Sequence, residues 1–479
     1  MSRAARARAL RLIFLIAATC AVSATSSAQT FTTLSWFPGF DEYGVFSPLI
    51  QGADGNYYGT ALDDSGGYGN IYKITPAGVI TILYNFCSLP NCADGSLPEG
   101  APLVLGTDGN FYGVTYLGGE SCTIDGSAGC GTVFKITPSG TLTVLHTFSG
   151  PDGSEPTWLM QDSGGNFYGT TALGGAESGL GCGTIFKITP HGTLTTLHSF
   201  DSTDGCYPVG LIQAANGKLY GAALAGGLTN VPLCENYGFE FTCGTVFNIT
   251  TGGVFTLIDD LSGTTGAYPL VPMVQAANGD FYGTAILFQY GNGDIYRLDA
   301  NGTLKAVYWW KGTAIGGSTG LIQASDGNLY GTGGQGYSSD CSSIFKISLT
   351  NEYTPVYEGC GDDGGLFENN TLLQGTNGVF YGSYVGDFAS AIYSLDAGLS
   401  PFIAFVQPSA KASQTAEILG QGLTGATQVT FNGVAASSFT VVSDTYITAV
   451  VPTGATSGPV VVTTPAGILT SIVNFQIAE

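Results

Sequence analysis

The sequence predicts an all-β protein in which a seven-bladed β-propeller of four-stranded blades is followed by an immunoglobulin-like β-sandwich. Short apolar segments alternate with turn signals throughout the chain, and helical periodicity is absent. The 73 glycines and 44% hydrophobic residues supply turns for many short strands and apolar surface for buried sheets. A Tyr-Gly pair recurs seven times at intervals of 48 to 62 residues, which indicates a repeat architecture. Its copies begin at Tyr58, Tyr112, Tyr168, Tyr220, Tyr282, Tyr330 and Tyr381.

Residues 1–28 have the pattern of a secretory signal peptide. Four arginines precede an apolar run over residues 12–18, and Ser26-Ser27-Ala28 fits cleavage after Ala28. Lipid attachment at Cys20 is a second interpretation, disfavoured by the size of Thr19. Since we find no other apolar run as long as a membrane span, we expect a secreted or cell-surface protein, with the periplasm as the alternative location.

Each repeat divides into four strands, a to d, which in the third copy are expected at 157–161, 166–170, 183–189 and 193–200. A two-residue turn such as Asp54-Gly55 joins strands a and b, and both of its positions tolerate positive φ. Strands c and d are joined by turns such as Thr137-Pro138-Ser139-Gly140. Four antiparallel strands per unit, repeated seven times over residues 29–398, predict a propeller.

The two ends of the repeat region complement each other. The last copy has no strand d, whereas residues 31–37 resemble strand d of the second copy and precede the first strand a. We therefore expect the N-terminal segment to complete the last blade and close the ring.

In such blades, the a/b and c/d turns share one face, and the b/c loops and d-to-a crossovers share the other. The loop face holds the segments of variable length, so it is the candidate ligand surface. Its aromatic residues are candidates for stacking on carbohydrate rings, and its acidic residues are candidates for calcium binding. The candidate ligand residues are Asp63, Asp64, Trp158, Tyr237, Trp309, Trp310, Asp362 and Asp363.

Ten cysteines follow the signal segment, an even number that favours disulfides in an exported protein. Their places in the repeat predict five local bridges on the loop face. The expected pairs are Cys87–Cys92, Cys122–Cys130, Cys182–Cys206, Cys234–Cys243 and Cys341–Cys360.

Glutamines recur on strand a, three residues before the turn, with Leu105 as the exception. Since strand a is innermost in a propeller, we expect a ring of amides around the channel that bridges adjacent blades, with ligand binding as the alternative. The ring comprises Gln51, Gln161, Gln213, Gln275, Gln323 and Gln374.

The sequence offers little catalytic chemistry. His146 and His198 fill one position of strand d, where Tyr84 stands in another copy, which favours packing over catalysis. Removing the signal leaves nine basic residues against 35 acidic ones, a formal charge of −26, so nucleic acid is excluded as a partner. We expect neither a catalytic residue nor a cofactor, calcium aside.

Two family resemblances follow from these motifs. Asp326-Gly-Asn-Leu-Tyr-Gly-Thr332, with Gly131 to Ile136, resembles the GloVer tandem-repeat proteins of bacteria, choice-of-anchor type, over residues 29–398. Residues 399–479 resemble an IPT/TIG domain through Ile418 to Leu423 and Val429 to Gly433. The first resemblance implies export and no assigned activity, and the second implies an adhesion or spacer module.

The leading hypothesis is a non-enzymatic extracellular binding or adhesion scaffold with a glycan or protein ligand. A secreted polysaccharide hydrolase or lyase, using acidic residues of the loop face, is the alternative. A structural envelope protein is the third hypothesis.

Overall fold

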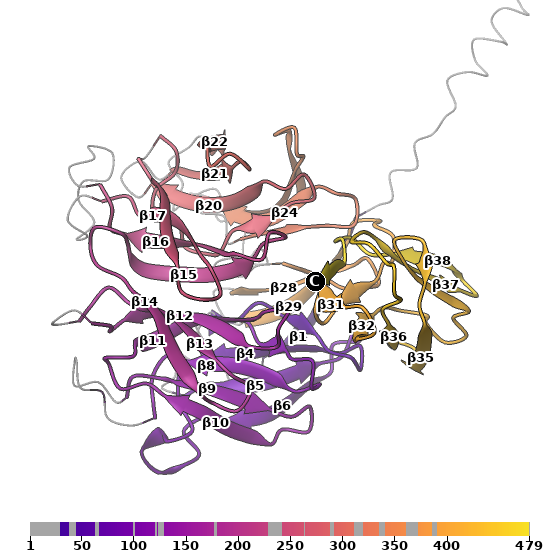
Figure 1. Ribbon diagram of the computed structural model, residues 1–479, viewed down its shortest axis with the longest axis horizontal. Helices are drawn as coiled ribbons and strands as arrows, with labels where there is room; N and C mark the ends of the chain where they lie inside the picture. The colour runs from indigo at the N-terminus through magenta and orange to yellow at the C-terminus, as the bar shows by residue number, and fades with distance from the viewer. Residues whose placement is uncertain are drawn as a thin grey trace, which may run out of the picture.

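The computed structural model in Figure 1 describes residues 29–37, 45–62, 67–98, 101–119, 122, 129–176, 180–228, 242–262, 264–287, 292–310, 320–334, 341–360, 372–385 and 390–478. Regular structure in these ranges is β-strand apart from one short 3₁₀ turn, η1 (Pro90–Cys92). The predicted signal segment, residues 1–28, lies outside the described residues. The chain is therefore all-β, as its sequence predicts.

The described residues between 30 and 396 form seven antiparallel sheets, six of four strands and one of five. The first sheet contains β2 (Val45–Phe46), β3 (Ile50–Gln51), β4 (Tyr57–Leu62), β5 (Asn70–Ile74) and β6 (Ile80–Asn85). The second contains β7 (Val104–Leu105), β8 (Phe111–Thr115), β9 (Thr132–Ile136) and β10 (Leu142–Thr147). The third contains β11 (Ser154–Gln161), β12 (Phe167–Leu173), β13 (Thr184–Ile188) and β14 (Leu194–Ser199). The fourth contains β15 (Cys206–Gln213), β16 (Leu219–Ala225), β17 (Thr245–Ile249) and β18 (Phe255–Asp260).

The remaining sheets follow the same order of strands. The fifth contains β19 (Val274–Gln275), β20 (Phe281–Leu287), β21 (Asn292–Leu298) and β22 (Leu304–Trp309). The sixth contains β23 (Leu321–Gln323), β24 (Leu329–Gly334), β25 (Cys341–Ile347) and β26 (Tyr353–Cys360). The seventh joins β27 (Leu373–Gln374), β28 (Phe380–Val385) and β29 (Ser390–Asp396) to the N-terminal strand β1 (Thr30–Trp36).

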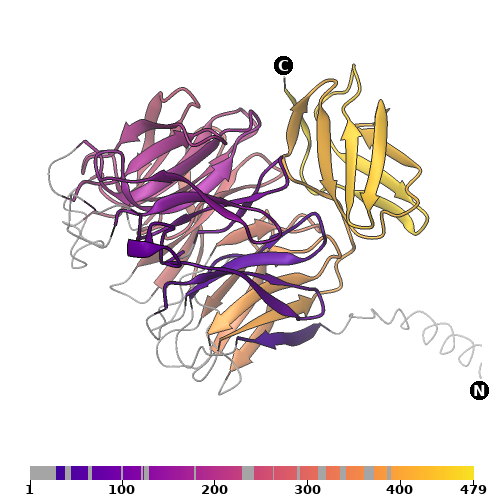
Figure 2. The same ribbon diagram turned by 90° about the horizontal axis from the view of Figure 1, so that it is seen from below.

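The N-terminal strand supplies the missing strand of the last repeat. β1 pairs antiparallel with β29, from Thr30 opposite Asp396 to Trp36 opposite Ala391, and Figure 2 shows this indigo strand beside orange strands from late in the repeat region. Phe31 stacks on Tyr357 of the sixth sheet with ring centroids 4.4 Å apart. The two ends of the repeat region therefore share one sheet.

The repeated Tyr-Gly phrase is explained by two contacts, of which the first is made in every sheet but the third, where the Tyr168 hydroxyl has no hydrogen-bond partner among the described residues. The tyrosine hydroxyl bonds to the turn: Tyr58 donates to Asp54 over 2.8 Å, and in an asparagine copy Asn377 donates to Tyr381 over 2.8 Å. The glycine lies opposite the aromatic residue of strand c, whose ring covers it. A Cβ on Gly283 would lie 2.3 Å from the ring of Tyr296, so this position excludes larger residues.

Aromatic rings also join neighbouring sheets. Tyr58 lies 4.1 Å from Phe111 of the next sheet, between ring centroids, and Tyr112 lies 4.1 Å from Phe167 of the one after. The same contact joins the last sheet to the first, where Tyr381 lies 4.1 Å from Tyr57. The seven sheets thus follow one another around a centre, a β-propeller-like fold with strand a innermost.

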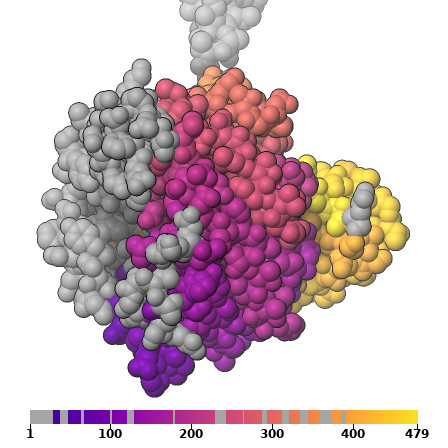
Figure 3. All heavy atoms as spheres, turned by 60° about the vertical axis from the view of Figure 1, so that its left-hand side comes forward, coloured from indigo at the N-terminus to yellow at the C-terminus, as the bar shows by residue number. Residues whose placement is uncertain are grey.

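The C-terminal residues form three further sheets around a separate apolar core. One sheet contains β30 (Ala404–Phe405), β32 (Thr415–Leu419), β36 (Tyr446–Val450) and β35 (Ser438–Ser443). A second contains β34 (Val434–Ala435), β33 (Gln428–Phe431), β37 (Val460–Thr464) and β38 (Gly467–Thr470), and β31 (Ser409–Lys411) pairs parallel with β39 (Gln476–Ala478). Their core includes Ile418, Phe431 and Phe475. These C-terminal sheets, yellow in Figures 1 to 3, lie to one side of the repeat region.

The described part of the chain contains no helix that is long and apolar enough to cross a membrane.

Candidate functional site

The strand a glutamines link six of the seven pairs of adjacent sheets on the face that carries the a/b turns; the pair of first and second sheets is the exception. Gln213 accepts the backbone N–H of Ser163 from the preceding sheet over 3.1 Å and donates to Gly217 O in its own turn over 3.4 Å. Gln51 links the first sheet to the seventh by accepting the N–H of Thr376 over 3.0 Å. Comparable bonds to the preceding sheet are made by Gln161, Gln275, Gln323 and Gln374. These amides therefore serve the cohesion of the repeat region.

The C-terminal sheets contact the turn face where the glutamine series is interrupted. Leu105 packs in one apolar cluster with Leu419, with Ala53 and Tyr446 beside it. Thr445 Oγ1 donates to Ala53 O over 2.7 Å, and Gln407 Nε2 donates to Gln161 Oε1 over 3.1 Å. A leucine at position 105 supplies an apolar contact that an amide could not. The described C-terminal strands thus lie on the turn side of the repeat region (Figure 2).

Disulfides join loops and strand ends on the opposite, loop-bearing face. The structure has the bonds Cys87–Cys92, Cys122–Cys130 and Cys182–Cys206, three of the five expected pairs. Cys243 is also disulfide-bonded, while Cys234 lies outside the described residues. Cys341 lies opposite Cys360 in the register of β25 and β26.

Both strand d histidines bind an aspartate of the following crossover. His146 Nε2 lies 2.8 Å from Asp152 Oδ2, and His198 Nε2 lies 2.9 Å from Asp204 Oδ2. Although burial alone would raise it, the pKa of Asp152 is lowered by hydrogen bonds from His146 and Ser149. The imidazoles are therefore anchors for the crossovers, each already engaged with a carboxylate.

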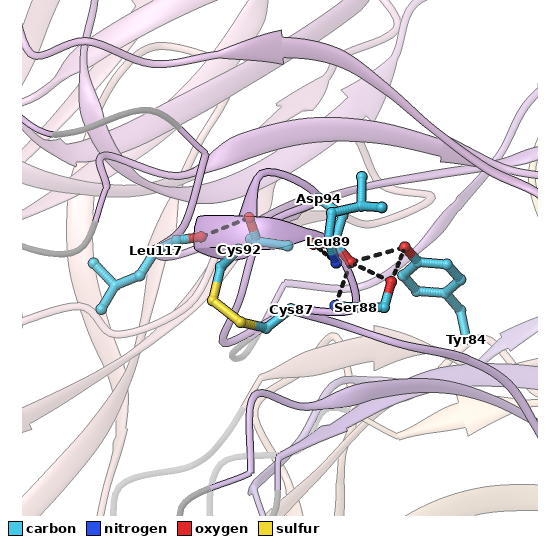
Figure 4. Close-up of a disulfide and its surroundings, with 8 residues drawn as sticks. Tyr84, Cys87, Ser88, Leu89, Cys92, Asp94 and Leu117 are labelled. Carbon is cyan, nitrogen blue, oxygen red and sulfur yellow. Dashed lines mark hydrogen bonds between the residues drawn. A yellow bond between two sulfur atoms is a disulfide. The ribbon is translucent and has the colours of Figure 1, made fainter.

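Tyr84 makes the same contact in the first sheet, which explains why histidine and tyrosine share this position. Its hydroxyl donates to Asp94 Oδ2 over 2.8 Å, and the N–H groups of Ser88 and Leu89 donate to the same carboxylate (Figure 4). The disulfide between Cys87 and Cys92 closes this loop. The side chain and the bridge together fix the crossover into the second sheet.

The candidate ligand residues do not come together in the described structure. Trp158 lies on the innermost strand of the third sheet, where its Nε1 donates to Leu211 O over 3.0 Å. Trp309 packs half-buried against the core of the fifth sheet, and Trp310 lies edge-on to Phe345, with ring centroids 5.4 Å apart. The other predicted ligand residues, Asp63, Asp64, Tyr237, Asp362 and Asp363, lie outside the described residues.

Asp294, which sequence reasoning did not select, has the most unusual environment of the described carboxylates. It is 1% exposed, and neither carboxylate oxygen has a hydrogen-bond partner in the described structure. Burial raises its pKa to about 8. Thr184 and Thr245 hold the same position in the third and fourth sheets, so alignment of the copies could have revealed the exception. Burial and the nearby Asp294 also raise the pKa of Tyr296, whose hydroxyl is likewise unpaired among the described residues.

Within the described ranges, three or more histidine, cysteine or acidic side chains do not converge on a point that could hold a metal ion. The carboxylates of Asp94, Asp152 and Asp204 in the described crossovers bind tyrosine, histidine or backbone groups instead. The calcium hypothesis stays a prediction.

Residues 49–231 match the family model of the Gloeobacter/Verrucomicrobia repeat, so this part of the chain carries that repeat. No curated protein matches the sequence. A solved gluconolactonase from Xanthomonas campestris is 14% identical, with a TM-score of 0.40, over 66% of this chain and 90% of its own. An oligogalacturonate lyase in complex with manganese is 10% identical, with a TM-score of 0.46, over 77% and 96%. PorZ, a surface component of the type-IX secretion system of Porphyromonas gingivalis, is 14% identical, with a TM-score of 0.46, over 89% and 58%.

Proposed function

We propose that this chain is an exported, non-enzymatic binding scaffold that takes an extracellular ligand, glycan or protein, on its loop face. In this proposal residues 29–398 are a closed seven-bladed propeller, and residues 399–479 are an IPT/TIG module of immunoglobulin type. The disulfides support export, because such bonds persist in oxidising compartments.

The observation that carries the proposal is that the two faces differ: the turn face makes the framework contacts, and the loop face carries the variable crossovers. On the turn face, the glutamines bind neighbouring sheets and the C-terminal sheets occupy the position around Leu105. On the loop face, disulfides and aspartate anchors fix crossovers of unequal length. A rigid framework that carries variable loops is the usual arrangement of a binding surface.

The alternative of a secreted polysaccharide-acting enzyme draws on one observation, the buried carboxyl group of Asp294. A pKa of about 8 keeps this group protonated at neutral pH, which is the state a general acid needs. At 1% exposure, however, the side chain does not reach a substrate on the surface. The scaffold is therefore the better supported function.

A glycan array probed with the mature chain, residues 29–479, tests the proposal. We expect retention on a subset of glycans and no release of products from a matching panel of polysaccharides. Product release that is lost in Asp294→Asn, or in the double variant Asp362→Asn with Asp363→Asn, would establish the enzyme instead. Absence of binding together with assembly into oligomers would favour a structural envelope protein.

A further inference from the structure

The C-terminal residues touch the a/b turns on both sides of one boundary in the ring of sheets. This boundary lies between the seventh sheet and the first, where the two ends of the repeat region meet, and we refer to it as the seam. A Cβ on Gly378 of the seventh sheet would lie 2.3 Å from Leu399 O. A Cβ on Gly55 of the first sheet would lie 2.7 Å from Thr445 Cγ2. In four other sheets, a Cβ at the same turn position would meet no described atom within 4 Å: Gly109, Gly217, Gly279 and Gly327. Close contact with C-terminal residues at this position is therefore confined to the sheets that flank the seam.

The segment that leads to the C-terminal sheets starts on one side of the seam. Residues 397–407 follow β29 of the seventh sheet. Leu399 packs in the apolar cluster between the sixth and seventh sheets, a cluster that also includes Phe31 of β1. The N–H of Phe402 donates to Thr376 O, in the turn of the seventh sheet, over 3.0 Å. The beginning of the segment is therefore fixed to the seventh sheet.

The same segment then grips the sheets on the other side of the seam. Ala404 and Val406 pack in the apolar cluster between the first and second sheets. Gln407 and Thr445 add the hydrogen bonds to the third and first sheets that are described above. The chain thus passes, within a few residues, from the core between the sixth and seventh sheets to the core between the first and second.

The N-terminal strand crosses the seam in the opposite direction. β1 precedes the first sheet in the chain and pairs with β29 of the seventh. It lies at the edge of that sheet, and none of its seven residues is buried, whereas β29 beside it is mostly buried. Since stabilisation grows with the apolar surface removed from water, β1 contributes less to closure than an inner strand would. A second contact across the seam therefore adds to the stability of the closed ring.

We infer that the C-terminal sheets act as a clasp, in which residues 397–407, Leu419 and Thr445 hold the seam closed from the turn face in addition to β1. A spacer or adhesion module needs only one connection to the repeat region. The clasp instead contacts sheets on both sides of the seam, so that opening the ring breaks its contacts as well as those of β1. This inference does not depend on which ligand binds the loop face.

Hydrogen exchange of the mature chain tests the clasp with two pairs of matched variants. Gly55→Ala places a methyl group against the clasp at a φ of 78°, and its control Gly109→Ala places one at 76° where no described atom lies within 4 Å. Gly378→Ala and its control Gly279→Ala form the second pair, at 89° and 88°. Backbone strain is therefore nearly equal within each pair and cancels in the comparison. We expect the amides of β1 and β29 to exchange about tenfold faster in Gly55→Ala and Gly378→Ala than in their controls. The amides of β21 and β22 in the fifth sheet should exchange at equal rates.

A double variant, Gln407→Ala with Thr445→Ala, loosens the clasp without introducing a clash and should accelerate exchange of the same amides. If a glycine variant does not fold, this double variant decides the question. Equal exchange of β1 and β29 in the variants and their controls would refute the clasp. Faster exchange in the C-terminal sheets alone would also refute it, because these sheets would then dock on the turn face without holding the seam.

Discussion

Replacing Asp294 with threonine should stabilise the protein at neutral pH and remove part of its pH dependence. The native carboxyl group is 1% exposed and unpaired among the described residues, and burial raises its pKa from 3.8 to about 8. Threonine is the residue of three other sheets, and there the hydroxyls of Thr184 and Thr245 donate to Asp152 O and Asp204 O. The substitution therefore introduces the hydroxyl donor that the equivalent position already supplies in the third and fourth sheets.

The sign of the effect follows from where the proton is held. The unfolded chain loses the Asp294 proton near pH 4, whereas the folded chain keeps it until about pH 8. Because the folded state binds the extra proton, stability falls as pH rises from 4 to 8 and is constant above that. At pH 7 the difference between the two pKa values corresponds to an upper limit of about 4 kcal/mol.

Denaturant unfolding of the wild type and Asp294→Thr at pH 4.5 and pH 8 measures this difference. We expect the two proteins to differ by about 1 kcal/mol at pH 4.5 and the variant to be more stable by several kcal/mol, up to about 5, at pH 8. Thr245→Asp, which places the same carboxyl group in the fourth sheet, should show the reverse. A gain of equal size at both pH values would refute the ionisation argument.

Three further predictions concern the closure of the ring, the turn face and the crossovers. Deleting residues 29–37 removes β1 from the seventh sheet and should lower the unfolding free energy, measured by denaturant unfolding, by on the order of 5 kcal/mol. The control Trp36→Ser, at a 54% exposed position of the same strand, should change the unfolding free energy little. If the deletion is as stable as the wild type, β1 does not close the ring. Leu105→Gln should weaken the contact with Leu419, so that limited proteolysis releases residues 399–479 faster than in the control variant Gln213→Leu. An equal rate of release in the two variants would show that Leu105 does not hold the C-terminal sheets. His146→Ala should cost about 1 kcal/mol and His146→Tyr less, because Tyr84 binds Asp94 in the same way. Because the pKa of the Asp152 carboxylate is lowered in the folded state, its contribution to stability is present above about pH 4 and is lost as pH falls further. In acid unfolding, the stability difference between His146→Ala and wild type should therefore become smaller.

The spacing of the Tyr-Gly phrase was enough to predict the sheets, because each copy carries its own turn and its own strand pattern. The pairing of β1 with β29 was also foreseeable, since the last repeat lacks a strand that residues 31–37 supply. The contact between the glycine and the aromatic residue of strand c could not be foreseen from the sequence, because it depends on the register between strands b and c. Gly283 meets Tyr296 only once that register is fixed.

The candidate site was less accessible to sequence reasoning. Trp158 stood out as a large aromatic residue, yet its indole N–H is bonded to the backbone of the neighbouring sheet. Asp294 could have been found by comparing the copies, although its burial could not.

The central claim is that ligands bind on the loop face and that the turn face serves the framework and the C-terminal sheets. Hydrogen exchange of the mature chain, with and without the oligosaccharide that it binds most tightly, tests this claim directly. We expect ligand-dependent protection in the crossovers at residues 94–98, 152–158 and 204–209, and unchanged exchange in the turns at residues 53–56, 107–110 and 326–328. Protection confined to the turns, with the crossovers unchanged, would contradict the account.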